Sequence, residues 1–176
     1  ENPSFLSTPG AKDVGIEFYT FSKTFNMAGW RLAFAAGNDQ MIEALNLIQD
    51  HLFVGIFPAL QEAGITALLD PKSEEAVAQL NATYDSRRDA FVQAAAKIGW
   101  QAFPSRGSFY AWMPVPEGYT SESFADLLLE KAHVAVAPGK GFGPAGDAYV
   151  RIGLLVEPER LVEAVDRIAN LQLFNN

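Results

Sequence analysis

The residues with the clearest chemical potential lie in one short run, from Thr20 to Arg31. Lys23 carries an amine that can form an imine with a carbonyl compound, and such an amine needs an apolar setting to stay partly neutral. Aromatic and small residues surround it in the sequence. Thr20, Ser22 and Arg31 supply the hydroxyl and guanidinium donors that an anionic phosphate needs. The run therefore indicates an imine-forming lysine beside a phosphate anchor.

Three arginines differ from the other charged residues, most of which fall on segments with an amphipathic helical pattern. Arg31, Arg106 and Arg151 lie among apolar or glycine-rich neighbours. An arginine in apolar surroundings generally has an anionic partner. This pattern favours a small acidic substrate or cofactor, although Arg106, next to Gly107, is more typical of a turn arginine in water.

The composition limits the alternatives. The chain has 176 residues, of which 49% are hydrophobic and 19% charged, and this is typical of a globular chain that fills one domain or parts of two. Cysteine is absent and only His51 and His133 are present, so we expect no metal site. The net charge of −8 disfavours nucleic acids and anionic membranes as partners. No secretory signal or membrane-spanning stretch is evident, so we expect a cytoplasmic protein.

Two segments rich in β-forming residues flank the lysine run and must position it. Residues 16–21 and 31–37 are expected to be strands, the second one buried, with the lysine loop between them. Helices are expected after an Asn38-Asp39 cap, through about Asp50, and again over about 59–69. The lysine run thus lies at the end of a strand pair.

The second half of the chain has a different pattern of residues. Pro71 and the Gly- and Pro-free stretch 73–98 predict a long helix that crosses between domains, with the boundary near Asp70-Pro71. Strands are then expected at 100–103, 108–113, 134–137 and 149–155, and helices at 121–131 and 158–173. The glycines at 139, 141, 143 and 146 predict a turn-rich loop, because Pro144 and a strand pattern follow them where a dinucleotide-binding fingerprint needs a helix.

The Thr20 to Arg31 run resembles the pyridoxal-phosphate lysine motif of class I and II aminotransferases, in which a phosphate-binding arginine follows the lysine by eight positions. Lys23 and Arg31 have this spacing, and the family pattern continues from Ser22 to Ala33. Thr20 stands where the family usually has Gly or Ser. The resemblance implies that Lys23 is catalytic and binds pyridoxal 5'-phosphate as a Schiff base, while Arg31, Ser22 and Thr20 bind the phosphate.

Two later segments are also similar to this family, so the resemblance covers essentially the whole chain. Residues 105–112, preceded by Pro104, resemble its Pro-x-Gly-x-Phe-Tyr strand. Residues 136–151 resemble its Pro-Gly-x-x-Phe-Gly loop, which leads to the arginine that binds the substrate α-carboxylate. Arg151 falls on that position, and its planar fork of donors suits a carboxylate.

The resemblance implies an α/β fold, the C-terminal part of the fold-type-I pyridoxal-phosphate-dependent transferase fold. Residues 1–70 would be the C-terminal piece of the large cofactor-binding domain, and residues 71–176 the interdomain helix and the small α/β domain. The family has an Asp-x-x-Tyr segment upstream of the lysine, and residues 1–16 contain no such pair. We therefore expect this chain alone to bind the cofactor poorly and not to turn over.

The activity implied for the full-length protein is amino-group transfer between an amino acid and a 2-oxo acid, by a homodimer. Residues 26–31 and 50–55 resemble bacterial aminotransferases of methionine salvage and of alanine or glutamine transamination. Two alternatives stay open. One is a pyridoxal-phosphate-dependent C–S β-lyase of the same fold, and the other is a non-catalytic, aminotransferase-like sensor domain of a transcription regulator.

Overall fold

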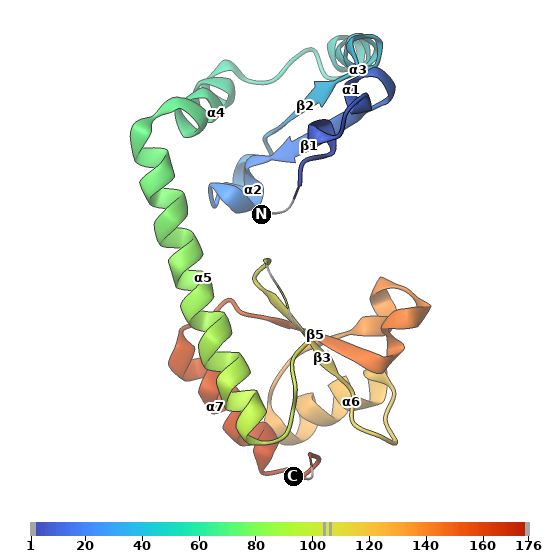
Figure 1. The fold of residues 1–176 in the computed structure, drawn as a ribbon, viewed down its shortest axis with the longest axis vertical. Helices are drawn as coiled ribbons and strands as arrows, with labels where there is room; N and C mark the ends of the chain where they lie inside the picture. The colour runs from blue at the N-terminus through green and yellow to red at the C-terminus, as the bar shows by residue number, and fades with distance from the viewer. Residues whose placement is uncertain (1–2, 104, 106, 175–176) are drawn as a thin grey trace. The chain divides into compact units, whose positions relative to one another are not determined.

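The computed structural model describes residues 3–103, 105 and 107–174 (Figure 1). Pro104 and Arg106, which the sequence pattern singled out, lie outside the described residues. The chain divides into two compact units, Glu1–Gln79 and Leu80–Asn176. The division falls inside the long helix α5 (Pro71–Lys97), and the expected boundary near Asp70-Pro71 coincides with the start of that helix. The domain assignment itself stays a prediction.

The first unit is built on one antiparallel strand pair, β1 (Ile16–Thr20) and β2 (Ala33–Gly37) (Figure 1). The register runs from Ile16 opposite Gly37 to Thr20 opposite Ala33. A 3-10 turn, η1 (Phe5–Ser7), and the short helix α1 (Ala11–Val14) precede β1. A Cβ atom on Gly37 would lie 2.4 Å from the carbonyl oxygen of Gly15, so this close approach of two backbones requires glycine.

The expectation that the second strand is buried is wrong for this chain. β2 pairs only with β1 among the described residues, so the aromatic side chains on the pair stay open to solvent. Phe18 on β1 is 65% exposed and Phe34 on β2 is 41% exposed. The residue pattern identified the strand correctly, whereas its burial depends on neighbours that the described residues do not supply.

Two helices follow the strand pair, α3 (Asp39–Leu52) and α4 (Pro58–Leu69). The predicted cap is confirmed, since the Oδ1 atom of Asn38 accepts a hydrogen bond from the Met41 N–H at 3.1 Å. Such a contact satisfies one of the unpaired N–H groups at a helix start. Pro58 occupies the first turn of α4, where the missing N–H costs nothing.

The second unit contains an antiparallel sheet in the order β3-β5-β4, with β3 (Tyr110–Pro114), β4 (Ala137–Pro138) and β5 (Tyr149–Gly153). β3 and β5 are labelled in Figure 1. One sheet face packs on α6 (Ser121–Leu127), α7 (Pro158–Ala169) and the C-terminal part of α5. The alternate residues on the other face include Tyr110, Trp112 and Arg151. The core between sheet and helices contains Phe91, Ala94, Ala95, Trp100, Ala111, Met113, Phe124, Leu128, Val150, Ile152, Leu154, Leu161, Val165 and Ile168.

Several predicted bounds in this unit are wrong in detail. Residues 100–103 form no strand, because Trp100 is buried in the core and its indole N–H donates to the Pro114 carbonyl at 2.8 Å. The strand expected at 134–137 is shorter than predicted and consists of the two residues of β4, Ala137–Pro138. The helix expected over 121–131 ends at Leu127 and continues as a π-helical turn, η3 (Leu128–Ala132), and α7 ends at Ala169 before the predicted 173.

The glycine-rich segment forms two 3-10 turns, η4 (Gly139–Phe142) and η5 (Pro144–Ala148), which confirms the predicted turn-rich loop. Within the part of the chain that the structure describes, no helix combines the length and the apolar character needed to cross a membrane. The same residues contain no group of three or more His, Asp or Glu side chains that could hold a metal ion.

Candidate active site

Four of the five predicted site residues lie at one end of the β1-β2 pair. Thr20 ends β1, and the next residues form the short helix α2 (Phe21–Thr24), which carries Ser22 and Lys23. The Phe21 N–H donates to the Leu32 carbonyl at 3.1 Å. This bond joins the residue just after β1 to the residue just before β2, so the segments that carry Ser22 and Arg31 start from the same end of the pair. The structure therefore brings Thr20, Ser22, Lys23 and Arg31 to the same end of the strand pair.

Helix α4 supports this segment from behind. Gly64 in α4 is buried, and a Cβ atom there would lie 2.7 Å from the Leu32 side chain and 3.3 Å from the Phe21 ring. Phe21 and Leu32 are themselves buried. The glycine thus lets α4 pack closely on Phe21 and Leu32, the two hydrogen-bonded residues between which the lysine segment runs.

The two hydroxyls of the segment form a small network. The Thr20 hydroxyl donates to Ser22 Oγ at 3.0 Å, and Thr20 Oγ1 accepts from the Ser22 N–H at 3.2 Å. Thr20 is therefore the cap of α2, which is why the chain turns helical at Phe21 instead of extending the strand as predicted. Because Ser22 Oγ accepts here, its own proton can point to another acceptor.

Arg31 adopts an uncommon backbone conformation. Its φ is +53°, in the left-handed region, at the point where the 3-10 turn η2 (Ala28–Trp30) leads toward β2. One guanidinium nitrogen, Nη1, donates to the Ala28 carbonyl at 3.0 Å. A non-glycine residue with this φ is unfavourable unless its surroundings hold it, and such residues cluster at functional sites. The guanidinium is thus folded over its own loop, with donors left over for an anion.

Lys23 is exposed in the described chain, between buried Phe21 and half-buried Phe25. The two rings lie 5.5 Å apart, and the Asn26 N–H donates to the Lys23 carbonyl at 3.3 Å. The apolar setting that the sequence indicated is therefore only partly supplied by the described residues of this unit. The aromatic part of this setting comes from Phe21 in α2 and from Phe25, the residue that ends α2.

The donor set at this end suits a phosphate-bearing aldehyde. Two hydroxyls and a guanidinium provide hydrogen bonds and charge for a phosphate, and a primary amine on the same segment can bond to an aldehyde carbon. The hydroxyls of Thr20 and Ser22 are within hydrogen-bond distance of each other, and Arg31 directly precedes Leu32, whose carbonyl accepts from the Phe21 N–H. The residues present therefore fit the group that the sequence resemblance implies.

Arg151 lies in the second unit, on β5, and is half-buried. Its guanidinium carbon is 4.1 Å from the ring centroid of Tyr110 and 4.2 Å from that of Phe142. Both are cation–π contacts, and no acidic side chain among the described residues pairs with Arg151. Stacked aromatic rings cover the faces of a guanidinium and leave its N–H edge for a carboxylate.

Sequence reasoning missed the two rings that hold Arg151. Tyr110 alternates with core residues along β3, and Phe142 lies in the glycine-rich loop. Both rings belong to the family motifs at residues 105–112 and 136–151. Tyr110 is part of the Phe-Tyr pair at 109–110, and Phe142 is the aromatic residue of the Pro-Gly-x-x-Phe-Gly loop. What the sequence could not give is the register that places Tyr110 diagonally beside Arg151, whose direct partner on β3 is Trp112.

Comparison with known proteins defines the class. The sequence profile described as "Aminotransferase class I and II" matches residues 5–168, so the chain belongs to that family. The family depends on pyridoxal 5'-phosphate, as expected from the lysine motif. The predicted fold class is confirmed, since the α/β structure matches solved fold-type-I aminotransferases.

Particular relatives sharpen the comparison. Over 171 residues the chain is 61% identical to L-glutamine--4-(methylsulfanyl)-2-oxobutanoate aminotransferase of Bacillus subtilis. The aligned region covers 97% of this chain and 42% of that protein. It is 48% identical over 166 residues to LL-diaminopimelate aminotransferase of Moorella thermoacetica, covering 94% and 42%. The structure of apo-BacF from Bacillus subtilis superposes with a TM-score of 0.91 at 46% identity, covering 98% of this chain and 44% of that chain. The chain thus spans less than half the length of the relatives it matches.

Proposed function

We propose that the full-length protein is a pyridoxal-phosphate-dependent aminotransferase that moves an amino group between an amino acid and a 2-oxo acid. The observation that carries the proposal is the arrangement of Thr20, Ser22, Lys23 and Arg31 at one end of the β1-β2 pair. Family membership supports it, because the matching profile is that of aminotransferases. No metal enters the proposal.

The lysine segment would hold the cofactor and move the proton. Lys23 would bind the cofactor covalently through Nζ, while Arg31, Ser22 and Thr20 would bind its phosphate. When bound, pyridoxal phosphate supplies an aldehyde carbon that receives the amino group and a conjugated ring that withdraws electrons from the substrate Cα–H bond. After the substrate amine displaces Lys23 from the cofactor, the freed Nζ would take the Cα proton of the donor and later deliver a proton to Cα of the acceptor.

Arg151 would bind the α-carboxylate that amino-acid and 2-oxo-acid substrates share. The guanidinium stacks on Tyr110 and Phe142, and this fixes its plane. A planar fork of N–H donors pairs with the two oxygens of a carboxylate at the same time. Both substrates would therefore use one binding group in turn.

The named relatives support a particular substrate pair. The B. subtilis relative at 61% identity is named for L-glutamine and 4-(methylsulfanyl)-2-oxobutanoate, and we include these as the donor and acceptor of the full-length protein. LL-diaminopimelate, from the name of the relative at 48% identity, is the second donor to examine. Transamination is favoured over β-elimination and over a sensor role, since both of these relatives carry aminotransferase names.

The setting of the proposed enzyme follows its family and charge. We include a cytoplasmic location and a homodimer in the proposal for the full-length protein. The net charge of −8 disfavours nucleic acids and anionic membranes as partners. Light scattering coupled to gel filtration measures the assembly, and a monomeric mass for the active protein would contradict the homodimer.

The experiment is a two-substrate assay with the full-length protein and added pyridoxal phosphate. We expect L-glutamine and 4-(methylsulfanyl)-2-oxobutanoate to yield methionine, measured by liquid chromatography and mass spectrometry. Release of pyruvate and a thiol from cystathionine, without an oxo acid, would instead indicate the β-lyase. Cofactor binding without turnover of any amino donor would indicate the sensor domain.

A further inference from the structure

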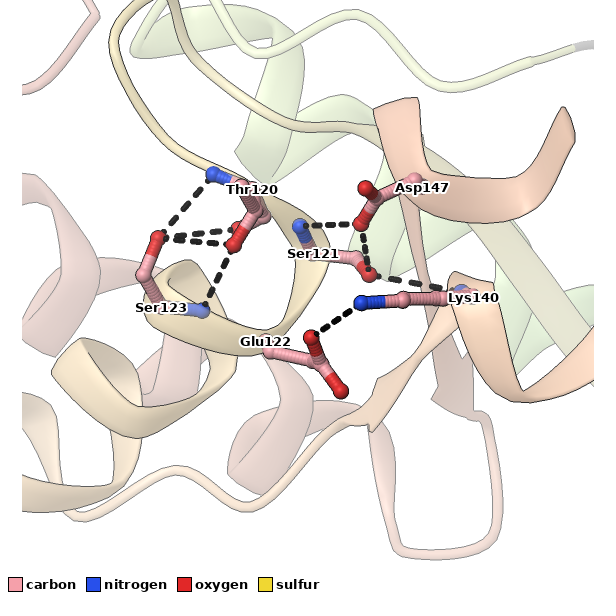
Figure 2. A network of polar contacts seen from close by, with 6 residues as sticks. All are labelled: Thr120, Ser121, Glu122, Ser123, Lys140 and Asp147. Carbon is pink, nitrogen blue, oxygen red and sulfur yellow. Dashed lines mark hydrogen bonds and ion pairs between the residues drawn. The ribbon is translucent and has the colours of Figure 1, made fainter. Parts of the chain in front are cut away.

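The loop of residues 139–148 is tied near both of its ends to one buried hydroxyl. Ser121, the first residue of α6, has no exposed surface. Its Oγ donates to Asp147 Oδ1 at 2.8 Å and accepts from the backbone N–H of Lys140 at 3.3 Å (Figure 2). The Ser121 N–H also donates to Asp147 Oδ1, at 3.2 Å. We call Ser121, the Lys140 N–H and the Asp147 carboxylate the Ser121 clamp.

Gly139 and Gly146 let the two ends of the loop approach each other beside the Ser121 clamp. A Cβ atom on Gly139 would lie 2.2 Å from the Gly146 carbonyl oxygen, and one on Gly146 would lie 2.0 Å from that of Gly139. Both obstructing atoms belong to the backbone, so neither could move aside without moving the chain. Gly139 and Gly146 are therefore in contact beside the Ser121 clamp. The residues between them form the tip of the loop.

Phe142 is at this tip, and its ring lies over Arg151. The distance from the ring centroid to the guanidinium carbon is 4.2 Å. Phe142 is 53% exposed, and its other ring contact is an edge contact with Trp112 at 5.9 Å. Burial therefore contributes little to holding this ring. Tyr110, by contrast, is fixed in the sheet by its pairing with Gly153.

The exposed ion pair at the loop is a weaker restraint than the clamp. Lys140 Nζ lies 2.8 Å from Glu122 Oε2, and the two side chains are 53% and 58% exposed. Ion pairs in water contribute little, because solvent and salt screen them. The clamp differs because its central hydroxyl is buried, and a buried polar group that loses its partner costs more.

We infer that Ser121 and Asp147 are positioning residues for the binding of the substrate carboxylate. The clamp holds the loop so that Phe142 stays over the Arg151 guanidinium, and this keeps the N–H edge of Arg151 in one orientation. The inference rests on the carboxylate role proposed for Arg151. Loss of the clamp would weaken carboxylate binding and leave proton transfer at Lys23 intact.

The test uses steady-state kinetics of the full-length holoenzyme. We expect Ser121→Ala and Asp147→Ala to raise KM for the amino donor about five- to tenfold, the size of one cation–π contact. The kcat should stay within about twofold, since binding and not chemistry is affected. The inhibition constant of propionate, which offers a carboxylate without an amino group, should rise in parallel. A fall in kcat with an unchanged KM would overturn the inference.

Two matched variants separate positioning from general stability. Asp147→Asn keeps an oxygen that accepts from the Ser121 N–H and hydroxyl, so it should restore KM to within about twofold of the parent. Glu122→Gln removes the exposed ion pair at the same loop and should leave KM unchanged. If Asp147→Ala does not fold, Ser121→Ala, which deletes one buried oxygen and keeps the backbone contact, decides the result. An effect of Glu122→Gln as large as that of Asp147→Ala would contradict the clamp.

Two further variants separate this inference from the proposed function. Phe142→Leu should raise KM by itself, and adding Ser121→Ala should raise it little more, because both act through one ring. Additive effects would show that the clamp does not act through Phe142. If Arg151→Lys leaves KM unchanged, the proposed carboxylate role fails. If Arg151→Lys raises KM and the clamp variants do not, only the inference fails.

Discussion

At the scale of single residues, the guanidiniums at 31 and 151 are held in different ways. Arg31 bonds to the Ala28 carbonyl of its own loop and has a φ of +53°. The guanidinium of Arg151 makes cation–π contacts with the rings of Tyr110 and Phe142. A side chain whose orientation is fixed before the ligand arrives loses less conformational freedom on binding. Both arginines therefore have orientations set for binding an anion, which we propose to be a phosphate at Arg31 and a carboxylate at Arg151.

Replacing Arg31 tests its phosphate role. We expect Arg31→Ala in the full-length protein to weaken pyridoxal-phosphate binding roughly ten- to a hundredfold, the value of a hydrogen bond to a charged group. The affinity of Arg31→Lys for pyridoxal phosphate should lie between those of the parent and Arg31→Ala, because an ammonium keeps the charge but not the fork of donors. The dissociation constant is measured by cofactor titration after gel filtration of the apoprotein. Arg160→Ala, a change on the exposed face of α7, is the control, and equal affinities for all variants would contradict the assignment.

At the scale of elements, close backbone approach decides where glycine is required in the loop of residues 139–148. A Cβ atom on Gly139 would meet two backbone oxygens, 2.2 Å away on Gly146 and 2.5 Å away on Tyr149. A Cβ atom on Gly141 would meet nothing within 4 Å. The two glycines are two positions apart in the same turn, so they form a matched pair.

We expect Gly139→Ala to destabilise the full-length protein by about 1 to 3 kcal/mol, the range for overpacking a well-filled site. Gly141→Ala should be neutral or slightly stabilising, because it only reduces the freedom of the unfolded chain. Thermal unfolding of the two variants beside the parent measures the difference. The loop geometry would be wrong if both variants unfolded at the same temperature.

The sequence predicted those elements whose signals are local. The Asn38 cap, the long helix after Pro71 and the strand containing Arg151 were all expected and are present. The errors arise where a distant contact decides. Trp100 leaves the predicted strand because its side chain is buried and its indole bonds to Pro114. The error at Phe21 is of another kind, since a local contact, the cap that Thr20 forms on the Ser22 N–H, ends β1 one residue before the predicted bound.

The same distinction holds for the candidate site. The lysine motif predicted four site residues within one run, and the structure brings them to one end of a strand pair because the run itself makes the turn. The setting of Arg151 was not predictable, since Tyr110, Phe142 and Arg151 come from separate segments. The Ser121 clamp joins α6 to the loop of residues 139–148, and no sequence motif marks that contact.

At the scale of the whole molecule, the two units differ in how much of their apolar surface is covered. The unit from Leu80 onward has a continuous core. The unit before it exposes large side chains, including Phe18, Leu52, Phe57 and Leu69. The chain spans 42% of the length of its B. subtilis relative.

Stability of the whole chain should depend on acid pH through three carboxylates. Hydrogen bonds from the Ser121 hydroxyl and N–H hold the pKa of Asp147 below its ordinary value. The Ser4 hydroxyl does the same for the pKa of Glu17, and Arg167 for that of Glu163. A carboxylate whose pKa is lower in the folded state stabilises the protein above the unfolded pKa, near 4, and this contribution is lost as the pH falls through the folded pKa.

We therefore expect the melting temperature of the full-length protein to fall as the pH drops below about 4 and through the lowered pKa values of these three groups. Asp147→Asn, which cannot titrate, should show a shallower fall over this window. Differential scanning fluorimetry across the pH series gives both curves. Parallel curves for the parent and Asp147→Asn would mean that the Ser121 contacts to the carboxylate do not form in the folded protein.

The central claim is that the amine at position 23 bonds to pyridoxal phosphate, and trapping that bond tests it most directly. The full-length protein is incubated with pyridoxal phosphate, reduced with borohydride, digested and analysed by mass spectrometry. We predict that the cofactor mass is found on the peptide containing Lys23 and disappears in Lys23→Ala. Recovery of the cofactor on another lysine in the parent protein, with none on Lys23, would contradict the account.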